Sequence, residues 1–324
     1  MNPFRITIDT NPDQCNLKCI MCDTHSIYNK DFKPTRQPMS KHLLEKCLNE
    51  AIASGVQEII PTTMGEPLLY KEFNLFIEKI SQSNAKLNLT TNGTFPKLGV
   101  RKWADKLLPV LSDIKISINA IDSKINETIM IGDHTVKKLE NIKTFAKLRD
   151  QYYPKVTITL QVTFLKTNLE EMEHIIQFGI EHNLNRVKGH QLWVTFEKNR
   201  CESLASDPME TDKWNHFVQR MDKYREQIML TNFTPIEPAK DTTMPSVPRS
   251  HNCPFLGKEL WIDNEGNFNI CCAPSKKRTT LGDWGNIATT RITEVFQSDN
   301  YKQLLQTYKD KDICKMCALR RAND

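Results

Sequence analysis

The chain has 324 residues and a formal net charge of +5, with 39% hydrophobic and 26% charged residues. This length allows a sizeable core, and the charge is too small and too scattered to predict a nucleic-acid surface. No stretch reaches the roughly 18 apolar residues of a membrane span, and the first residues lack the regions of a signal peptide. We therefore expect a cytoplasmic protein that binds neither nucleic acid nor membrane, and whose ten cysteines serve metal rather than disulfides.

Three cysteines follow the first predicted strand, Phe4–Asp9. Cys15, Cys19 and Cys22 form a C-x3-C-x2-C run within one loop. Thiolates are soft ligands that favour iron–sulfur clusters or zinc, and three of them leave one iron of a [4Fe–4S] cluster open to an outside ligand. His25 lies three residues after Cys22, so a zinc site of three thiolates and one imidazole is the alternative.

Hydrophobic patterning predicts an alternation of strands and helices up to about Val194. A serine N-cap begins the first helix, and Cys47 on the apolar face of that helix is expected in the core. Six strand–helix units with right-handed crossovers predict an α/β fold, a partial (β/α)6 barrel of parallel strands over residues 1–195. The expected strands are Phe4–Asp9, Val56–Pro61, Lys86–Leu89, Ile114–Asn119, Val156–Thr163 and Arg186–Val194, and the expected helices are Ser40–Ser54, Glu72–Ser83, Thr135–Asp150 and Leu169–His182.

Polar residues end several of these strands, at the edge where parallel α/β sheets bind ligands. The turn 62–67, which contains a Gly-Glu-Pro triplet, leaves the second strand on the same rim as the cysteine loop. Each of these residues alone is also explained as part of an ordinary turn or strand end, so their shared position carries the prediction.

Residues 196–252 are dominated by charged residues and prolines and predict a bridge with one helix near Glu210–Gln227. Residues 253–324 predict a small domain with a β-hairpin (Glu259–Ile262 and Phe268–Ile270) and a helix over Ile292–Thr307. Four cysteines of this domain either enclose a second [4Fe–4S] cluster with no open iron or hold a structural zinc ion. These cysteines are Cys253, Cys271, Cys314 and Cys317.

The order and spacing of these motifs resemble those of the radical S-adenosylmethionine (SAM) superfamily, with a shortened SPASM, or twitch, domain at the end. The resemblance implies two [4Fe–4S] clusters. SAM binds the first cluster and is cleaved to a 5′-deoxyadenosyl radical by an electron that flavodoxin or ferredoxin supplies, while the second cluster is auxiliary. The resemblance further implies SAM contacts from Met21, where an aromatic residue is usual, and from Gly65, Glu66, Asn92, Ser117 and Gln161.

In length and motif order the chain is similar to the 2-deoxy-scyllo-inosamine dehydrogenase family, which implies oxidation of a small sugar or aminocyclitol in a biosynthetic pathway. His190, on the last core strand, is the candidate acid/base group. One alternative is epimerisation, in which the Cys272 thiol returns a hydrogen atom to the substrate. A second is peptide modification, which is less expected because only fourteen residues precede Cys15. A third, from another class, is a non-catalytic scaffold with two zinc sites.

Overall fold

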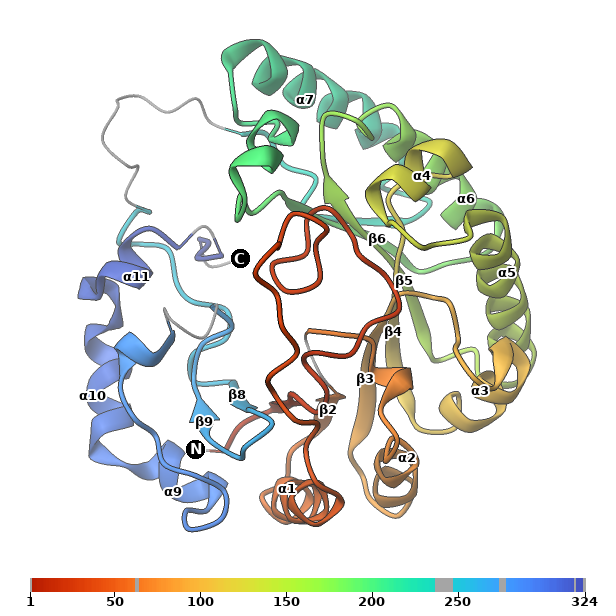
Figure 1. Ribbon diagram of the computed structural model, residues 1–324. Helices are drawn as coiled ribbons and strands as arrows, with labels where there is room; N and C mark the ends of the chain where they lie inside the picture. Colours follow the sequence, from red (N-terminus) through yellow and green to blue (C-terminus); the bar gives the residue numbers. More distant parts are fainter. Residues whose placement is uncertain (1, 62–63, 237–246, 274–277, 318, 323–324) are drawn as a thin grey trace.

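The computed structural model describes residues 2–61, 64–236, 247–273, 278–317 and 319–322 (Figure 1). Residues 62–63 of the predicted Gly-Glu-Pro turn and 237–246 of the predicted bridge lie outside this part. The strands are β1 (Arg5–Ile8), β2 (Glu58–Pro61), β3 (Lys86–Thr91), β4 (Leu111–Ser117), β5 (Thr157–Phe164), β6 (Arg186–Gln191), β7 (Met229–Thr231), β8 (Glu259–Ile262) and β9 (Phe268–Asn269). The helices are α1 (Lys41–Ala53), α2 (Asn74–Ser81), α3 (Gly99–Leu107), α4 (Ser123–Ile129), α5 (Thr135–Tyr152), α6 (Glu171–Glu181), α7 (Pro208–Met221), α9 (Ile292–Gln297), α10 (Asp299–Thr307) and α11 (Asp312–Lys315).

The described strands form one nine-stranded sheet in the order β7-β6-β5-β4-β3-β2-β1-β8-β9. Strands β1 to β7 are parallel to their neighbours, as is β8 beside β1, and β9 is antiparallel to β8. The sheet curves into an arc that does not close, with helices α1 to α6 along its outer side (Figure 1). The predicted α/β partial barrel is therefore confirmed, with its first six strands in chain order.

The predicted first helix is present as α1, and its N-cap is confirmed because the Ser40 hydroxyl accepts a hydrogen bond from the Leu43 amide at 3.2 Å. Cys47 on this helix is fully buried, as expected of a core residue. The predicted continuous helix over Ile292–Thr307 was wrong. It is divided into α9 and α10 at Ser298, which is extended and caps the Tyr301 amide with its own hydroxyl at 3.2 Å.

Helices α3, α4 and α11 and strand β7 were missed. Helix α3 is amphipathic, with Trp103, Ala104 and Leu107 buried, so its pattern was present and was overlooked. Helix α4 has seven residues, which is too short for a clear pattern. Strand β7 has three residues within the predicted bridge and pairs with β6, so part of the bridge extends the sheet. Strand β8 pairs with β1 and thereby joins the C-terminal segment to the same sheet.

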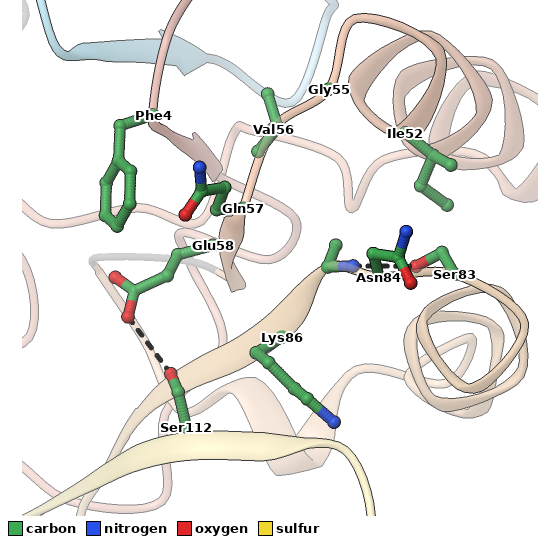
Figure 2. Close-up of a pocket in the computed structure, with 11 residues that line it drawn as sticks. Phe4, Ile52, Gly55, Val56, Gln57, Glu58, Ser83, Asn84, Lys86 and Ser112 are labelled. Atoms are coloured by element: carbon green, nitrogen blue, oxygen red, sulfur yellow. Dashed lines mark hydrogen bonds between the residues drawn. The ribbon is translucent and has the colours of Figure 1, made fainter.

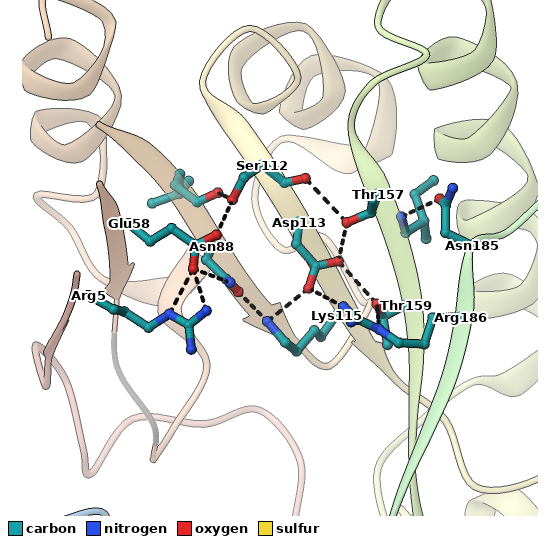
Figure 3. A network of polar contacts seen from close by, with 12 residues as sticks. Arg5, Glu58, Asn88, Ser112, Asp113, Lys115, Thr157, Thr159, Asn185 and Arg186 are labelled. Atoms are coloured by element: carbon teal, nitrogen blue, oxygen red, sulfur yellow. Dashed lines mark hydrogen bonds and ion pairs between the residues drawn. The ribbon is translucent and has the colours of Figure 1, made fainter. Parts of the chain in front are cut away.

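A polar network crosses the sheet near the amino ends of its strands (Figure 3). Arg5 on β1 pairs with Glu58 on β2 and, at 2.6 Å, with Glu259 on β8. Asp113 on β4 pairs with Lys115 at 3.0 Å and with Arg186 on β6 at 2.8 Å. Because each charge has an opposite partner, this network stabilises the amino-terminal end of the barrel, which we call its floor. The rim formed by the carboxyl ends of the strands is left for binding.

Candidate active site at the carboxyl rim of the barrel

The loop that carries the first three cysteines lies inside the arc of strands, shown in red in Figure 1. Main-chain hydrogen bonds hold this loop: the Glu66 amide donates to the Gln14 carbonyl at 2.8 Å, and the Lys18 amide donates to the Ile131 carbonyl at 2.9 Å. The Asn92 side chain adds a bond from its amide nitrogen to the Asn16 side-chain oxygen, also at 2.8 Å. The loop is thus fixed to the carboxyl ends of β2 and β3.

The thiols of Cys15, Cys19 and Cys22 are brought together and partly buried. Burial raises the pKa of Cys15 to about 11 and that of Cys19 to about 12, and the neighbouring thiol charges act in the same direction. Two of the sulfurs already accept main-chain bonds, from Leu17 to Cys15 at 3.4 Å and from His25 to Cys22 at 3.2 Å. Buried thiolates that repel one another and accept amide hydrogen bonds suit a cationic iron–sulfur core.

His25 does not complete this set of thiols. The Nε2 atom of its ring lies 2.9 Å from the Pro12 carbonyl oxygen, and the ring packs edge-on to Phe32. Because Nδ1 of the ring can also bind zinc, the zinc alternative is decided by the placement of the side chains. Among the described residues, no three His, Cys, Asp or Glu side chains stand close enough to hold a single metal ion.

Gly65 allows the turn after β2 to approach the cysteine loop. Its φ of +81° is in the left-handed region, and a Cβ atom there would lie 2.5 Å from the main-chain oxygens of both Asn11 and Gln14. The next residue, Glu66, is buried, and its carboxylate accepts bonds from Thr91 at 2.8 Å and from the Asn92 amide at 2.7 Å. Burial raises the pKa of Glu66 to about 7 despite these bonds. The carboxylate therefore locks the turn to the end of β3, beside the three thiols.

The predicted contacts on β3, β4 and β5 form one row. Ser117 pairs in register with Gln161, and Asn92 follows Thr91, which pairs with the residue before Ser117. Within the described residues, the side chains of Ser117 and Gln161 have no hydrogen-bond partner and are only half-buried. Asn92, in contrast, is occupied by Asn16 and Thr94. The structure thus leaves Ser117 and Gln161 available to a ligand and uses Asn92 to position the loop.

Met21 and His190 lie at different places on this rim. Met21 packs against a small apolar cluster that contains Leu17 and Ile129, where Cys15 and Cys19 also pack. His190 on β6 pairs in register with Thr163, two residues beyond Gln161. Burial, together with the nearby charge of Lys188, lowers the pKa of His190 to about 4, so its imidazole is neutral at pH 7.

The C-terminal cysteines also converge. Burial raises the pKa of Cys253, with the thiol charges at Cys271 and Cys317 acting in the same direction, and burial with the same neighbours raises that of Cys314 to about 12. Main-chain amides donate to Cys253 and Cys271 at 3.4 Å, as they do in the first set. Cys272 directly follows Cys271 and is exposed, and the interaction of the two thiols lowers the pKa of Cys271 to about 7 and raises that of Cys272. Four thiols that gather at one place, one buried and three partly buried, suit a fully coordinated cluster.

Several residues outside the cysteine and Gly-Glu-Pro motifs support the site, and the sequence analysis did not identify them. The Asn11 side chain donates to the Glu66 carbonyl at 2.9 Å, and the Asn199 side chain, in the predicted bridge, donates to the Ile20 carbonyl at 2.8 Å. Lys138 is fully buried beneath Ser117, where it pairs with Asp133 at 2.5 Å. A single lysine in an amphipathic helix gives no sequence signal that it points inward.

A separate hollow lies elsewhere in the described part of the protein. It has a volume of about 710 Å³ and lies near the amino ends of β2 and β3, between residues that include Phe4, Gln57 and Lys86 (Figure 2). None of the predicted site residues lines it. It is open to solvent at the floor of the barrel, so it is separate from the cysteine loop.

Two family profiles match the chain. Residues 12–179 match the Radical SAM superfamily, and residues 253–318 match SPASM, an iron–sulfur cluster-binding domain. GTP 3′,8-cyclase of Campylobacter jejuni is 30% identical over 183 residues, which are 55% of this chain and 52% of that protein. The chain thus aligns with about half the length of this relative.

Solved structures share the fold. Streptococcus suis SuiB bound to S-adenosylmethionine matches with a TM-score of 0.69 and 16% identity, over 98% of this chain and 71% of that one. BtrN in complex with AdoMet and 2-DOIA matches with a TM-score of 0.52 and 15% identity, over 98% of this chain and 94% of that one. At these identities the likeness concerns the fold alone.

Proposed function

The protein belongs to the radical SAM superfamily, and from this premise we propose that it removes two hydrogens from a carbinol of a small polyhydroxylated substrate, a sugar or aminocyclitol. Cys15, Cys19 and Cys22 would hold the SAM-binding cluster, and Cys253, Cys271, Cys314 and Cys317 the auxiliary cluster of the SPASM domain. We expect flavodoxin or ferredoxin to supply the electron. The three-part division at residues 195 and 252 stays a prediction.

When bound, SAM and the two clusters supply a radical that takes hydrogen from carbon and an acceptor for the electron that this oxidation releases. The side chains of the protein position the cysteine loop and SAM. Gly65 and Asn92 fix the cysteine loop against β2 and β3. The side chains of Ser117 and Gln161, which have no hydrogen-bond partner among the described residues, present polar atoms along the same row. These residues would hold SAM beside the inner face of β4 and β5.

The remaining step is removal of the hydroxyl proton, which turns the substrate into a ketone. His190 carries this part of the proposal because its neutral imidazole, on the inner face of β6, has no hydrogen-bond partner among the described residues. A neutral imidazole accepts a proton, and its position two residues beyond Gln161 on the neighbouring strand is within reach of a substrate beside SAM.

The position of Cys272 favours oxidation over epimerisation. A hydrogen-atom donor needs a thiol that meets the substrate carbon, whereas Cys272 is exposed and directly follows Cys271, a predicted ligand of the auxiliary cluster. This thiol therefore belongs to the auxiliary set. The matches to the Radical SAM and SPASM families also favour an enzyme with iron–sulfur clusters over the alternative of a non-catalytic zinc-binding scaffold.

The proposal is tested with anaerobically reconstituted protein, dithionite, SAM and a panel of sugars, aminocyclitols and peptides in heavy water. We expect one product two mass units lighter per 5′-deoxyadenosine released, from a sugar or aminocyclitol and from no peptide. His190→Gln should slow product formation about 100-fold, and Cys272→Ala should not change the product. Solvent deuterium in an otherwise unchanged substrate, lost by Cys272→Ala, would establish the epimerase instead.

A further inference from the structure

Lys188 extends the row of predicted SAM contacts by one strand. Ser117 pairs in register with Gln161, and Gln161 pairs with Lys188. Residues in register on neighbouring parallel strands point to the same face and lie about 4.8 Å apart. Lys188 therefore stands one strand beyond Gln161, where a substrate beside SAM would lie.

The side chain of Lys188 faces the inside of the barrel. Residues alternate in direction along a strand, and Arg186, two residues earlier, belongs to the inner polar network. Val187, between them, is fully buried in the hydrophobic core on the other face. His190 follows on the same side as Lys188, and the charge of Lys188 is felt at its imidazole.

Among the described residues, no carboxylate forms an ion pair with Lys188, although Asp113 and Glu259 lie near enough to attract its charge. The network on the floor is neutral, since Arg5, Lys115 and Arg186 face three carboxylates, those of Glu58, Asp113 and Glu259. Within the described residues, Lys188 makes no hydrogen bond or ion pair, although it is only partly exposed. A partly buried ammonium that adds one positive charge to a balanced network is costly unless a ligand pairs with it.

We propose that Lys188 binds an anionic group of the substrate, a carboxylate or a phosphate, and so selects sugar acids or sugar phosphates over neutral sugars and free amines. This inference rests on the proposed function, because it names the substrate class of the same site. Burial, and the charges of Lys115 and Arg186, lower the pKa of Lys188 to about 8, a repulsion that an arriving anion relieves.

The inference narrows the proposed substrates. An aminocyclitol with a free ammonium would meet Lys188 as a like charge and be disfavoured. A hexuronate or a hexose phosphate keeps the carbinol to be oxidised and adds the anion. The anion at Lys188 and a carbinol near His190 would lie two residues apart along β6, about 6.6 Å, which matches the span of a hexose.

The test measures binding to the SAM-loaded holoenzyme, without reductant, by anaerobic calorimetry. The probes are glucuronate, glucose 6-phosphate, glucosamine and glucose. We expect one of the two anions to bind at least tenfold more tightly than glucose, and glucosamine to bind no better than glucose. Tighter binding of glucuronate identifies the anion as a carboxylate, and tighter binding of glucose 6-phosphate identifies it as a phosphate.

Three variants make the result specific. Lys188→Met should weaken binding of the anion about 10- to 100-fold and leave that of glucose unchanged, whereas Lys188→Arg should restore most of it. Lys86→Met, which removes an exposed lysine of β3 beside the opposite hollow, should have no effect. Thermal unfolding of each variant establishes that it is folded.

The inference is overturned if neither anion binds better than glucose, or if Lys188→Met binds the anion as well as the unaltered protein. Equal losses of anion affinity in Lys188→Met and Lys86→Met would also overturn it, because they would indicate that the anion responds to the overall positive charge of the protein and not to Lys188. Anion binding that depends on Lys188 without any oxidation supports the inference and refutes the proposed function. If the protein oxidises neutral sugars, and Lys188→Met oxidises them equally well, the proposed function is supported and the inference about Lys188 is refuted.

Discussion

Substitution of Gly65 by alanine tests whether the turn after β2 positions the cysteine loop. The new Cβ would lie 2.5 Å from the main-chain oxygens of Asn11 and Gln14, about 0.8 Å closer than carbon and oxygen ordinarily approach. A side chain at this left-handed φ costs about 1 kcal/mol, and the overlap costs about 1–3 kcal/mol more. Gln14 directly precedes Cys15, so the loop shifts and SAM affinity should fall at least tenfold.

The chain offers a matched control. Gly55 has nearly the same φ, +78° against +81°, but nothing lies within 4 Å of the position that an alanine methyl group would take there. Gly55→Ala should therefore lose only the backbone contribution and bind SAM normally. Anaerobic urea unfolding and equilibrium dialysis with SAM compare the two variants. Equal destabilisation and equal SAM affinity would refute the claim that Gly65 is required by close packing against the loop.

Three further predictions follow from burial and charge. Lys138→Met removes the counter-ion of the buried Asp133 carboxylate, which keeps only the hydrogen bond from Asn126, and should lower the free energy of unfolding by about 3–5 kcal/mol, read from the urea midpoint. An unchanged midpoint would contradict the buried ion pair. The pKa of His190 is lowered in the folded state, so its contribution to stability is complete above about pH 6.5 and is lost as the pH falls toward 4. At pH 5 the unaltered protein should therefore lose about 2 kcal/mol that His190→Gln keeps, and parallel pH profiles would disprove this. Cys15→Ala should abolish reductive SAM cleavage, measured as 5′-deoxyadenosine, while Cys47→Ala in the core should retain it.

The sequence predicted the parts of the fold that have strong local signals. The parallel strands with buried β-branched residues, the serine cap of α1 and the spacing of the two cysteine sets need no knowledge of distant contacts. Ser117 and Gln161 were expected on one rim of the sheet, and the structure pairs them in register. Their roles as SAM contacts stay predictions.

Other features depend on contacts between distant residues and have no local signature. The break at Ser298 depends on a hydrogen bond that competes with the helix, and β7 is three residues long. The lack of an ion-pair partner for Lys188 among the described residues is visible only after the network through Arg5, Asp113 and Arg186 has been traced across the sheet (Figure 3). Asn199 likewise reaches the cysteine loop from a segment that looked like a linker.

Mössbauer spectroscopy of anaerobic ⁵⁷Fe-reconstituted protein, with and without SAM, tests the central claim most directly. We expect two [4Fe–4S] clusters, about eight irons per chain, and a change at a single iron when SAM is added. In the variant without Cys15 that change should disappear while the auxiliary spectrum remains. A protein that holds zinc but no [4Fe–4S] cluster, or a spectrum in which SAM changes no iron, would contradict the account.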